Sequence, residues 1–405
     1  MQSKFIPAYL LTLVNILGFS ILMPVLPFIV QESYGAPKYV YGLLLSCYSA
    51  FQFLGAPYLG SLSDSVGRKP ILIISQAGTF LSWIIFGCAY FLPDISVGGI
   101  ALPLMVIALS RILDGVTGGN TSVTQAYISD VTSKEEKNYI FGTIGGIIGL
   151  GMVIGPPIGG LSASSSIGYL GTVICCAILS AVTLVSLIWG LEESLPEEKR
   201  KPATPQSLWK MILVWQHIRE LKSPIIIQKI FVLRTLISIT MSTYVSTIAL
   251  FIIDLFHFNE QQLGLFMLFV GGFIAFNQAV VSKWFIRRIG VFRTLRVGMF
   301  LSFVGFISIT LTNTLWIYIS LYYILNLGIA LCMPTLHALL AQHAQEQEAG
   351  QVMGISESIA SLSSAIFPIV GAAVYGFIGG KLYWLVSILP LVGLFLSRRT
   401  QIKDG

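Results

Sequence analysis

The chain alternates between long apolar runs and short polar gaps. Twelve runs hold about the 20 apolar residues that a helix needs to cross the hydrocarbon core of a bilayer. They fall near residues 6–30, 40–61, 71–92, 99–127, 139–163, 167–190, 224–255, 262–283, 292–312, 314–341, 350–377 and 380–397. The pattern therefore predicts an all-α integral membrane protein with twelve transmembrane helices.

The longest and most charged gap, residues 191–223, separates six runs from the next six. We expect an N-terminal half at 1–190, a cytoplasmic linker at 191–223 and a C-terminal half at 224–405. Part of the linker has the helical spacing and basic surroundings of an interfacial amphipathic helix. The apolar positions of this predicted helix are Leu208, Met211, Ile212, Trp215 and Ile218.

An internal repeat also favours two halves. Pro156 and Gly159 in the fifth run recur as Pro368 and Gly371 in the eleventh, 212 residues later. Parallel repeats of six helices are typical of secondary transporters, whose substrate site lies at the midplane between the repeats. The repeat therefore predicts a transporter of this architecture.

Basic residues are distributed unevenly between the two sets of gaps. One set, with both termini, holds 20 Lys and Arg residues when the interfacial Lys229 is included, and the other set holds only Lys38 and Lys381. Loops rich in Lys and Arg stay in the cytoplasm. We therefore expect both termini to be cytoplasmic.

Composition excludes several functional classes. Only 10% of the 405 residues are charged and 55% are hydrophobic, whereas a soluble domain carries about 25% charged residues. A soluble enzyme, a disordered scaffold and a secreted disulfide framework are therefore excluded. The net charge of +6 comes from basic residues at helix ends, which indicates membrane orientation rather than nucleic-acid binding. The five Cys residues show no metal-ligand spacing, and no phosphate-binding loop for ATP occurs.

The gap after the second run combines glycines with opposite charges. It contains Gly60, Asp64, Gly67 and Arg68. The glycines permit a tight turn, and Asp64 and Arg68 can form charge-assisted hydrogen bonds. This spacing resembles the signature loop of the major facilitator superfamily. The resemblance implies a cytoplasmic gate that opens when the halves rock, while the alternative is a polar turn that serves only orientation.

Glycines also line one face of the fifth run. Gly151, Gly155, Gly159 and Gly160, with Pro156 among them, form a surface on which another helix can pack closely. This pattern resembles the motif of the proton-coupled antiporter branches of the superfamily. We expect the glycine face to seal the contact between the two halves against leak.

Arg111 and Asp114 lie inside the fourth run. Residues three apart share a helix face, and ionisable groups inside a membrane mark function. The segment resembles the second motif of the superfamily, whose Arg is implicated in proton transfer through a nearby acid. The resemblance implies that role for Arg111, with Asp114 as the candidate titrating partner. The alternative is a structural ion pair.

The second half has three ionisable groups at membrane depth. Glu357 lies in a Ser-rich stretch of the eleventh run, Arg234 in the seventh and His337 in the tenth. We expect Glu357 to carry a proton or to contact substrate, and the alternative is a salt bridge to Arg234. His337 is a further candidate proton carrier because imidazole titrates near neutral pH.

The first run resembles the tetracycline/proton antiporter group but departs from it at one position. Asn15, and likewise Ser82 in the third run, stand where that group has acids linked to metal–tetracycline handling and coupling. Their loss leaves a cavity in which Arg111 and Arg234 favour an anionic or zwitterionic substrate.

Together these features predict a proton-coupled secondary transporter that works by alternating access. The first hypothesis is a drug or small-molecule:H+ antiporter of the tetracycline-resistance type. The alternative is a permease or exporter of an anionic metabolite or carboxylate siderophore on the same fold. We expect no enzymatic activity, no metal and no cofactor, because the proton gradient drives transport. The expected partners are a small-molecule substrate, protons and the lipid bilayer, without nucleic acid, for a monomer in a bacterial inner membrane.

Overall fold

The computed structural model describes residues 5–133, 136–202, 218, 225–345 and 348–398. Within these residues the regular secondary structure is helical, mostly α-helical, apart from one short hairpin, in which β1 (Ser96–Val97) pairs antiparallel with β2 (Ile100–Ala101). The expectation of an all-α architecture is therefore confirmed.

Nine helical segments of the described residues are long and apolar enough to cross a bilayer. They are Arg68–Phe91, Leu102–Val131, Tyr139–Ala163, Tyr169–Gly190, Ile226–Phe256, Glu260–Ile289, Val291–Ser308, Leu315–His343 and Gly350–Ser397. A further helix, Ile6–Ser20, is apolar but shorter. These segments make the chain an integral, multi-pass membrane protein.

Packing divides the chain into two units. Met1–Leu208 and Phe258–Leu268 form unit 1, and Trp209–His257 and Phe269–Gly405 form unit 2. The amphipathic helix expected in the linker lies outside the described residues, with the exception of Ile218. Ile218 is buried among apolar residues of unit 2.

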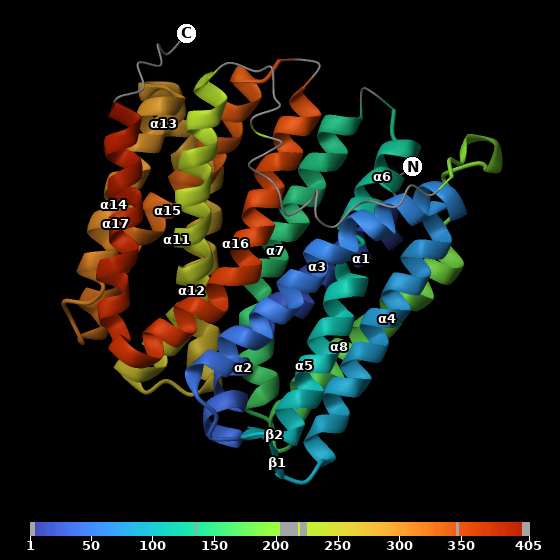
Figure 1. Cartoon of the computed structure of the whole chain (residues 1–405), viewed down its shortest axis with the longest axis horizontal. Coiled ribbons are helices and arrows are strands. Elements are labelled where there is room, and N and C mark those ends of the chain that lie inside the picture. The colour runs from blue at the N-terminus through green and yellow to red at the C-terminus, as the bar shows by residue number, and fades with distance from the viewer. Residues whose placement is uncertain (1–4, 134–135, 203–217, 219–224, 346–347, 399–405) are drawn as a thin grey trace. The chain divides into compact units, whose positions relative to one another are not determined.

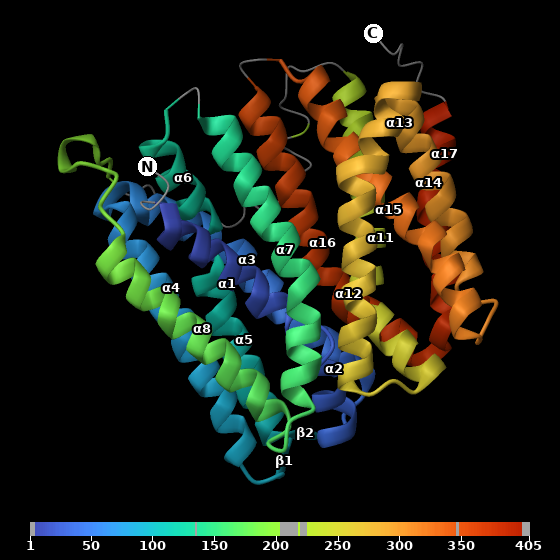
Figure 2. The same ribbon diagram turned by 180° about the vertical axis from the view of Figure 1, so that it is seen from behind.

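Unit 1 begins with eight α-helices, coloured from blue to green in Figures 1 and 2. They are α1 (Ile6–Ser20), α2 (Leu26–Phe28), α3 (Lys38–Val66), α4 (Arg68–Cys88), α5 (Leu102–Gly118), α6 (Thr121–Val131), α7 (Lys137–Ala163) and α8 (Tyr169–Gly190). The α3 helix packs along α5, α4 packs between α5 and α8, and α1 packs on α7. Glycines bring α3 and α5 together, since a Cβ at Gly115 would lie 2.9 Å from the Cβ of Phe51.

Unit 2 contains the remaining helices, and α12 begins in unit 1 and continues in unit 2. The helices are α11 (Ile225–Phe256), α12 (Glu260–Phe276), α13 (Ser282–Ile289), α14 (Val291–Ser308), α15 (Leu315–His343), α16 (Ala349–Ile378) and α17 (Leu382–Arg398). The α14 helix packs against α15 and α17, and α11 packs against α16. A Cβ at Gly305 would lie 2.7 Å from the Cβ of Leu325, so Gly305 allows the close approach of α14 and α15.

Candidate functional site

The loop between α3 and α4 is organised around Arg68. Its guanidinium lies 2.6 Å from the carboxylate of Asp64 and 3.3 Å from that of Asp130. It also donates a 2.6 Å hydrogen bond to the hydroxyl of Ser63. Arg68 is only 8% exposed, so this charge is satisfied almost entirely by protein groups. Asp64 and Arg68 were expected to pair from their spacing, and the structure brings them together.

Glu193 closes the same loop from the beginning of the linker. Its carboxylate accepts hydrogen bonds from the backbone N–H groups of Arg68, at 2.9 Å, and Lys69, at 3.1 Å. These are the first residues of α4, where the unpaired N–H groups and the helix dipole favour an anion. Downstream, the N–H of Lys201 donates to the carbonyl of Asp64 at 3.0 Å. The start of the linker therefore forms a strap over the loop.

The two glycines predicted for this loop play different parts. Gly67 has a φ of +115°, and a Cβ there would lie 2.5 Å from the carboxylate of Glu193. Both the backbone conformation and the strap therefore require glycine. A Cβ at Gly60 would lie 3.5 Å from the hydroxyl of Ser122, which is ordinary contact. Sequence reasoning missed Glu193 and Asp130, although the acidic start of the linker was visible.

Arg111 and Asp114 form a closed ion pair on α5. Nη1 of Arg111 lies 3.0 Å from Oδ2 of Asp114, and the side chains are 3% and 7% exposed. The guanidinium lies over the ring of Trp83 on α4, 4.6 Å from the ring centroid, an arrangement that favours a cation. Among the described residues, Nε and Nη2 of Arg111 have no hydrogen-bond acceptor. The pair is therefore desolvated, and two of the three guanidinium nitrogens of Arg111 donate no hydrogen bond within the described residues.

Asn15 belongs to an uncharged hydrogen-bond chain in the same unit. Its side-chain amide donates to Asn120 at 2.6 Å, and Asn120 donates to Ser75 at 2.6 Å. Ser75 in turn donates to the carbonyl of Thr117. Asn120 lies at the break between α5 and α6. The chain therefore links α1, α4 and the kinked fourth run through neutral groups.

The glycine face of α7 packs mainly on α1. A Cβ at Gly151 would lie 2.8 Å from Ile16, and Cβ atoms at Gly155 and Gly159 would collide with Ser20 and the carbonyl of Ile21. Ser20 also donates to the carbonyl of Gly151 at 3.0 Å. These glycines therefore set the α1–α7 contact inside unit 1.

The C-terminal end of the same face contacts the beginning of α12. A Cβ at Gly160 would lie 3.1 Å from the Cα of Gly264, and a Cβ at Gly264 would lie 2.6 Å from the carbonyl oxygen of Pro156. Both partners belong to unit 1. The glycines predicted to form a seal thus allow backbone contact with two helices of this unit.

Unit 2 brings Arg234, Glu357 and His337 together from three helices. Nη2 of Arg234 on α11 and Nε2 of His337 on α15 lie 3.8 Å and 3.4 Å from the same oxygen of Glu357 on α16. Arg234 is also fixed by hydrogen bonds to Ser356, at 3.1 Å, and to the sulfur of Met333, at 2.8 Å. We call Arg234, His337 and Glu357 the α11–α15–α16 cluster.

Exposure within the α11–α15–α16 cluster is unequal. The side chain of Arg234 is 3% exposed, whereas those of His337 and Glu357 are 46% and 67% exposed. The cluster therefore presents an exposed carboxylate and an exposed imidazole beside a buried guanidinium. Within the described residues, no three His, Cys, Asp or Glu side chains are placed to hold a metal ion.

Comparisons with known proteins agree with this architecture. A model of the Major Facilitator Superfamily matches residues 8–368. The chain is 25% identical over 420 residues to the class H tetracycline resistance protein of Pasteurella multocida, across 100% of this chain and 98% of the relative. It is 28% identical over 407 residues to the class G protein of Vibrio anguillarum, across 98% of both chains. The crystal structure of the human organic anion transporter MFSD10 covers 98% of this chain and 99% of its own, with a TM-score of 0.70 and 22% identity.

Proposed function

The chain belongs to the major facilitator superfamily, a family of transporters rather than enzymes, and from this premise we propose that it is a proton-coupled antiporter that exports a small molecule. The observation that carries the proposal is the exposed carboxylate of Glu357 between the guanidinium of Arg234 and the imidazole of His337. The similarity of the chain to tetracycline resistance proteins favours a drug-like substrate. Transport proceeds by alternating access, with the proton gradient as the driving force and without a cofactor.

Proton exchange in the α11–α15–α16 cluster couples the two fluxes through charge. With Glu357 ionised and His337 neutral, the carboxylate balances the positive charge of Arg234. Binding one proton leaves the cluster with a net positive charge, which repels a cationic substrate group. Because Arg234 is held by Ser356 and Met333, it stays in place when the proton arrives. Proton binding and substrate binding therefore oppose each other through charge, which is the condition for antiport.

The proposed membrane topology has twelve crossings. Counting α1 and α3 beside the nine long apolar segments, and α16 and α17 as separate helices, supports that number. The halves are residues 1–190 and 224–405, joined by the linker at 191–223. The excess of Lys and Arg in one set of gaps favours cytoplasmic termini. We place the protein, as a monomer, in the inner membrane of a bacterium.

The loop around Arg68 is the proposed cytoplasmic gate. Its ion pairs to Asp64 and Asp130 and the strap through Glu193 are short, charge-assisted contacts that can hold one conformation and release it in another. The glycine face of α7 is the proposed seal against leak. Proton transfer through Arg111 and Asp114 requires this closed pair to open during the cycle.

A specific observation favours a second candidate function. Arg111 has two buried N–H-bearing nitrogens without acceptors among the described residues, and a buried unsatisfied donor is costly unless a ligand supplies the acceptor. A carboxylate group would satisfy both nitrogens. Neutral Asn15 in place of an acid agrees with such a substrate. This candidate is a permease or exporter of an anionic metabolite or a carboxylate siderophore.

Transport in liposomes distinguishes the two candidates. Purified protein is reconstituted in vesicles with an acid-loaded lumen and a pH-sensitive dye, and tetracycline, ethidium and a citrate-type siderophore are added in turn. Proton exit with tetracycline or ethidium, absent from protein-free vesicles, supports the antiporter. A response to the siderophore alone favours the second candidate. Substrate flux that ignores the pH gradient would contradict proton coupling.

A further inference from the structure

A cavity of about 310 Å³ lies at one end of the helices of unit 1. Its wall is built from α2 and the residues on either side of it, the turn after α4, the end of α7, the beginning of α8 and the beginning of α12. All of these residues belong to unit 1. None of them is part of the Arg68 loop, the Arg111–Asp114 pair or the α11–α15–α16 cluster. The volume falls at the lower end of the range for small-molecule sites.

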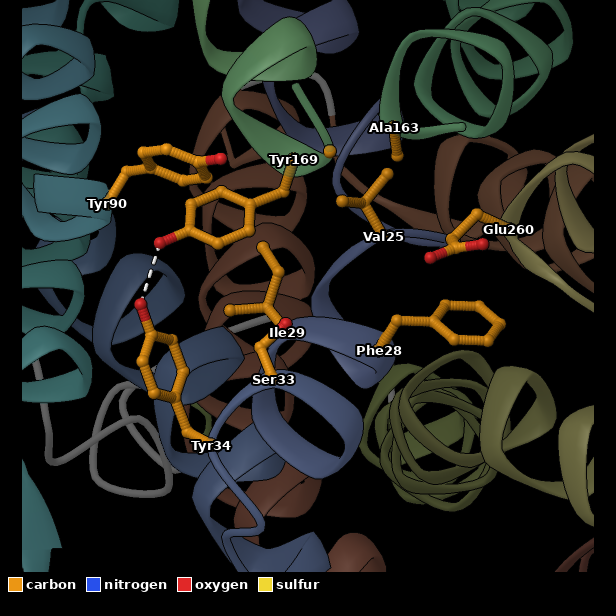
Figure 3. A pocket seen from close by; sticks show the side chains of 10 residues that line it. Val25, Phe28, Ile29, Ser33, Tyr34, Tyr90, Ala163, Tyr169 and Glu260 are labelled. Carbon is orange, nitrogen blue, oxygen red and sulfur yellow. Dashed lines mark hydrogen bonds between the residues drawn. The ribbon is translucent and has the colours of Figure 1, made fainter. Parts of the chain in front are cut away.

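Three tyrosines form one side of this cavity, as Figure 3 shows. The hydroxyls of Tyr34 and Tyr169 are hydrogen-bonded at 2.7 Å. The ring of Tyr90 meets that of Tyr169 edge to face, with centroids 5.3 Å apart and planes at 74°. These contacts hold the rings in place before any ligand arrives, which reduces the entropy lost on binding.

A carboxylate lies on the other side of the cavity. Glu260, at the start of α12, is beside Phe28 and Val25 in Figure 3. Its backbone is held closely by α7, because a Cβ at Gly160 would lie 3.1 Å from the carbonyl carbon of Glu260. Within the described part of the chain, the Glu260 carboxylate makes no ion pair. The cavity therefore has a carboxylate that no cationic side chain of the described residues pairs with.

We propose that this cavity binds a small organic cation with an apolar body, of the arylalkylammonium class. The ammonium group contacts the carboxylate of Glu260 and the ring of Phe28, and the apolar body lies over Ile29 toward the tyrosine side. Carboxylates pair with ammonium groups, and aromatic faces attract cations. None of the ten lining residues is basic. The site is separate from the proton cluster, so it adds a second ligand site to the transporter.

The surroundings of Tyr34 agree with a cation-attracting site. Burial raises the pKa of Tyr34, and the negative charge of Asp94 nearby raises it further. The hydroxyl therefore stays protonated at neutral pH and keeps its hydrogen bond to Tyr169. Asp94 adds a second negative charge near the tyrosine side of the cavity, which increases the local concentration of cations.

Calorimetric titration of the purified full-length protein with phenethylammonium tests the proposal. We expect saturable binding, at least about tenfold tighter than binding of the neutral analogue 2-phenylethanol, because only the cation pairs with Glu260. Glu260→Gln should weaken phenethylammonium binding by about tenfold or more. Glu32→Gln removes an exposed acid that does not line the cavity and serves as the matched control, with unchanged binding expected.

Two further titrations separate this cavity from the α11–α15–α16 cluster and test it independently of the folding of Glu260→Gln. The same measurement in Glu357→Gln protein should retain binding, which separates this cavity from the proton cluster. Tyr90→Ala, at a ring that is already 41% exposed, should weaken binding about threefold even if Glu260→Gln is poorly folded. Equal affinity for phenethylammonium and 2-phenylethanol, or unchanged binding in both cavity variants, would overturn the proposal. Loss of binding only in Glu357→Gln would assign the ligand to the proton cluster instead.

Discussion

The Arg111–Asp114 pair of unit 1 and the α11–α15–α16 cluster of unit 2 each contain a buried arginine. Their acids differ in exposure. Arg111 and Arg234 each have side chains that are 3% exposed, whereas Asp114 is 7% exposed and Glu357 is 67% exposed. A carboxylate sealed against its arginine cannot exchange a proton until the helices move. An exposed carboxylate can do so in the conformation described. The comparison therefore supports the proposal that proton exchange takes place in unit 2, while Arg111 and Asp114 of unit 1 form a closed pair.

Arg111 and Arg234 also differ in how many of their guanidinium nitrogens have a partner. Each guanidinium nitrogen of Arg234 lies near a partner, in Ser356, Met333 or Glu357. Arg111 pairs one nitrogen with Asp114, and its other two have no acceptor among the described residues. Unit 1 thus has guanidinium nitrogens without an acceptor among the described residues, and unit 2 has an exposed carboxylate. A substrate with an anionic group would use the first, and a proton or a cation would use the second.

The largest effect is expected from Asp114→Asn. The substitution leaves Arg111 buried without a counter-charge, which costs about 3–5 kcal/mol of stability. Thermal unfolding in detergent should show a clear loss. In the double variant Arg111→Leu/Asp114→Leu we expect a smaller loss, because no charge stays buried. Glu357→Gln removes a carboxylate that is 67% exposed and therefore screened by water, so it should cost about 1 kcal/mol or less. Equal destabilisation by Asp114→Asn and Glu357→Gln would contradict the inference that the exposure of the acid sets the cost of removing it.

The next largest effect is expected from Arg68→Ala, and it compares the Arg68 loop with its counterpart in unit 2. Both loops turn on a glycine of positive φ, Gly67 at +115° and Gly290 at +84°. Arg68 has two carboxylate partners, whereas Arg287 is exposed at the end of α13. Since hydrogen bonds to charged groups contribute about 1.5–3 kcal/mol, Arg68→Ala should lower transport turnover by at least about tenfold.

Arg287→Ala is the matched control for the Arg68 variant. We expect its turnover to stay within about twofold of the unmodified protein, because an exposed surface charge contributes little. Initial transport rates in liposomes, normalised to protein content, measure both variants. Equal losses in the two variants would mean that the loops contribute only membrane orientation.

The smallest effect is expected from His337→Gln in the α11–α15–α16 cluster. Imidazole is the side chain that normally titrates between about pH 5 and 8, and His337 lies 3.4 Å from the carboxylate of Glu357. Its removal should lower the initial rate of substrate-driven proton exit from liposomes about threefold. An unchanged rate would remove His337 from the proton path.

Contacts between residues close in sequence could be predicted from the sequence alone. The i,i+4 spacing of Asp64 and Arg68 and the i,i+3 spacing of Arg111 and Asp114 place each pair on one helix face, and both pairs are present. The all-α membrane architecture followed from the length of the apolar runs. These features depend on helix geometry and on the hydrocarbon thickness of a bilayer.

Contacts between distant segments could not be predicted in the same way. Glu193 caps α4 across 125 residues of sequence, and nothing in its acidic neighbourhood distinguishes it from Glu192. His337 was considered only as a separate proton carrier, because helix faces do not reveal which helices adjoin. The partner of Asn15 was hidden for a similar reason, since Asn120 reaches it only where α5 and α6 separate. Tertiary packing decides all of these contacts.

Proton movement in a Glu357 variant tests most directly the proposal that this carboxylate carries the coupled proton. Glu357→Gln protein is reconstituted in acid-loaded liposomes, and proton exit and substrate entry are recorded together. Ser358→Ala is the control, because this partly exposed neighbour donates a hydrogen bond back to the carbonyl of Gly354 on its own helix. We expect that Glu357→Gln lowers substrate-driven proton exit by about 100-fold while substrate exchange without a pH gradient continues, and that Ser358→Ala retains both. Proton exit at the unmodified rate in Glu357→Gln would contradict the proposal.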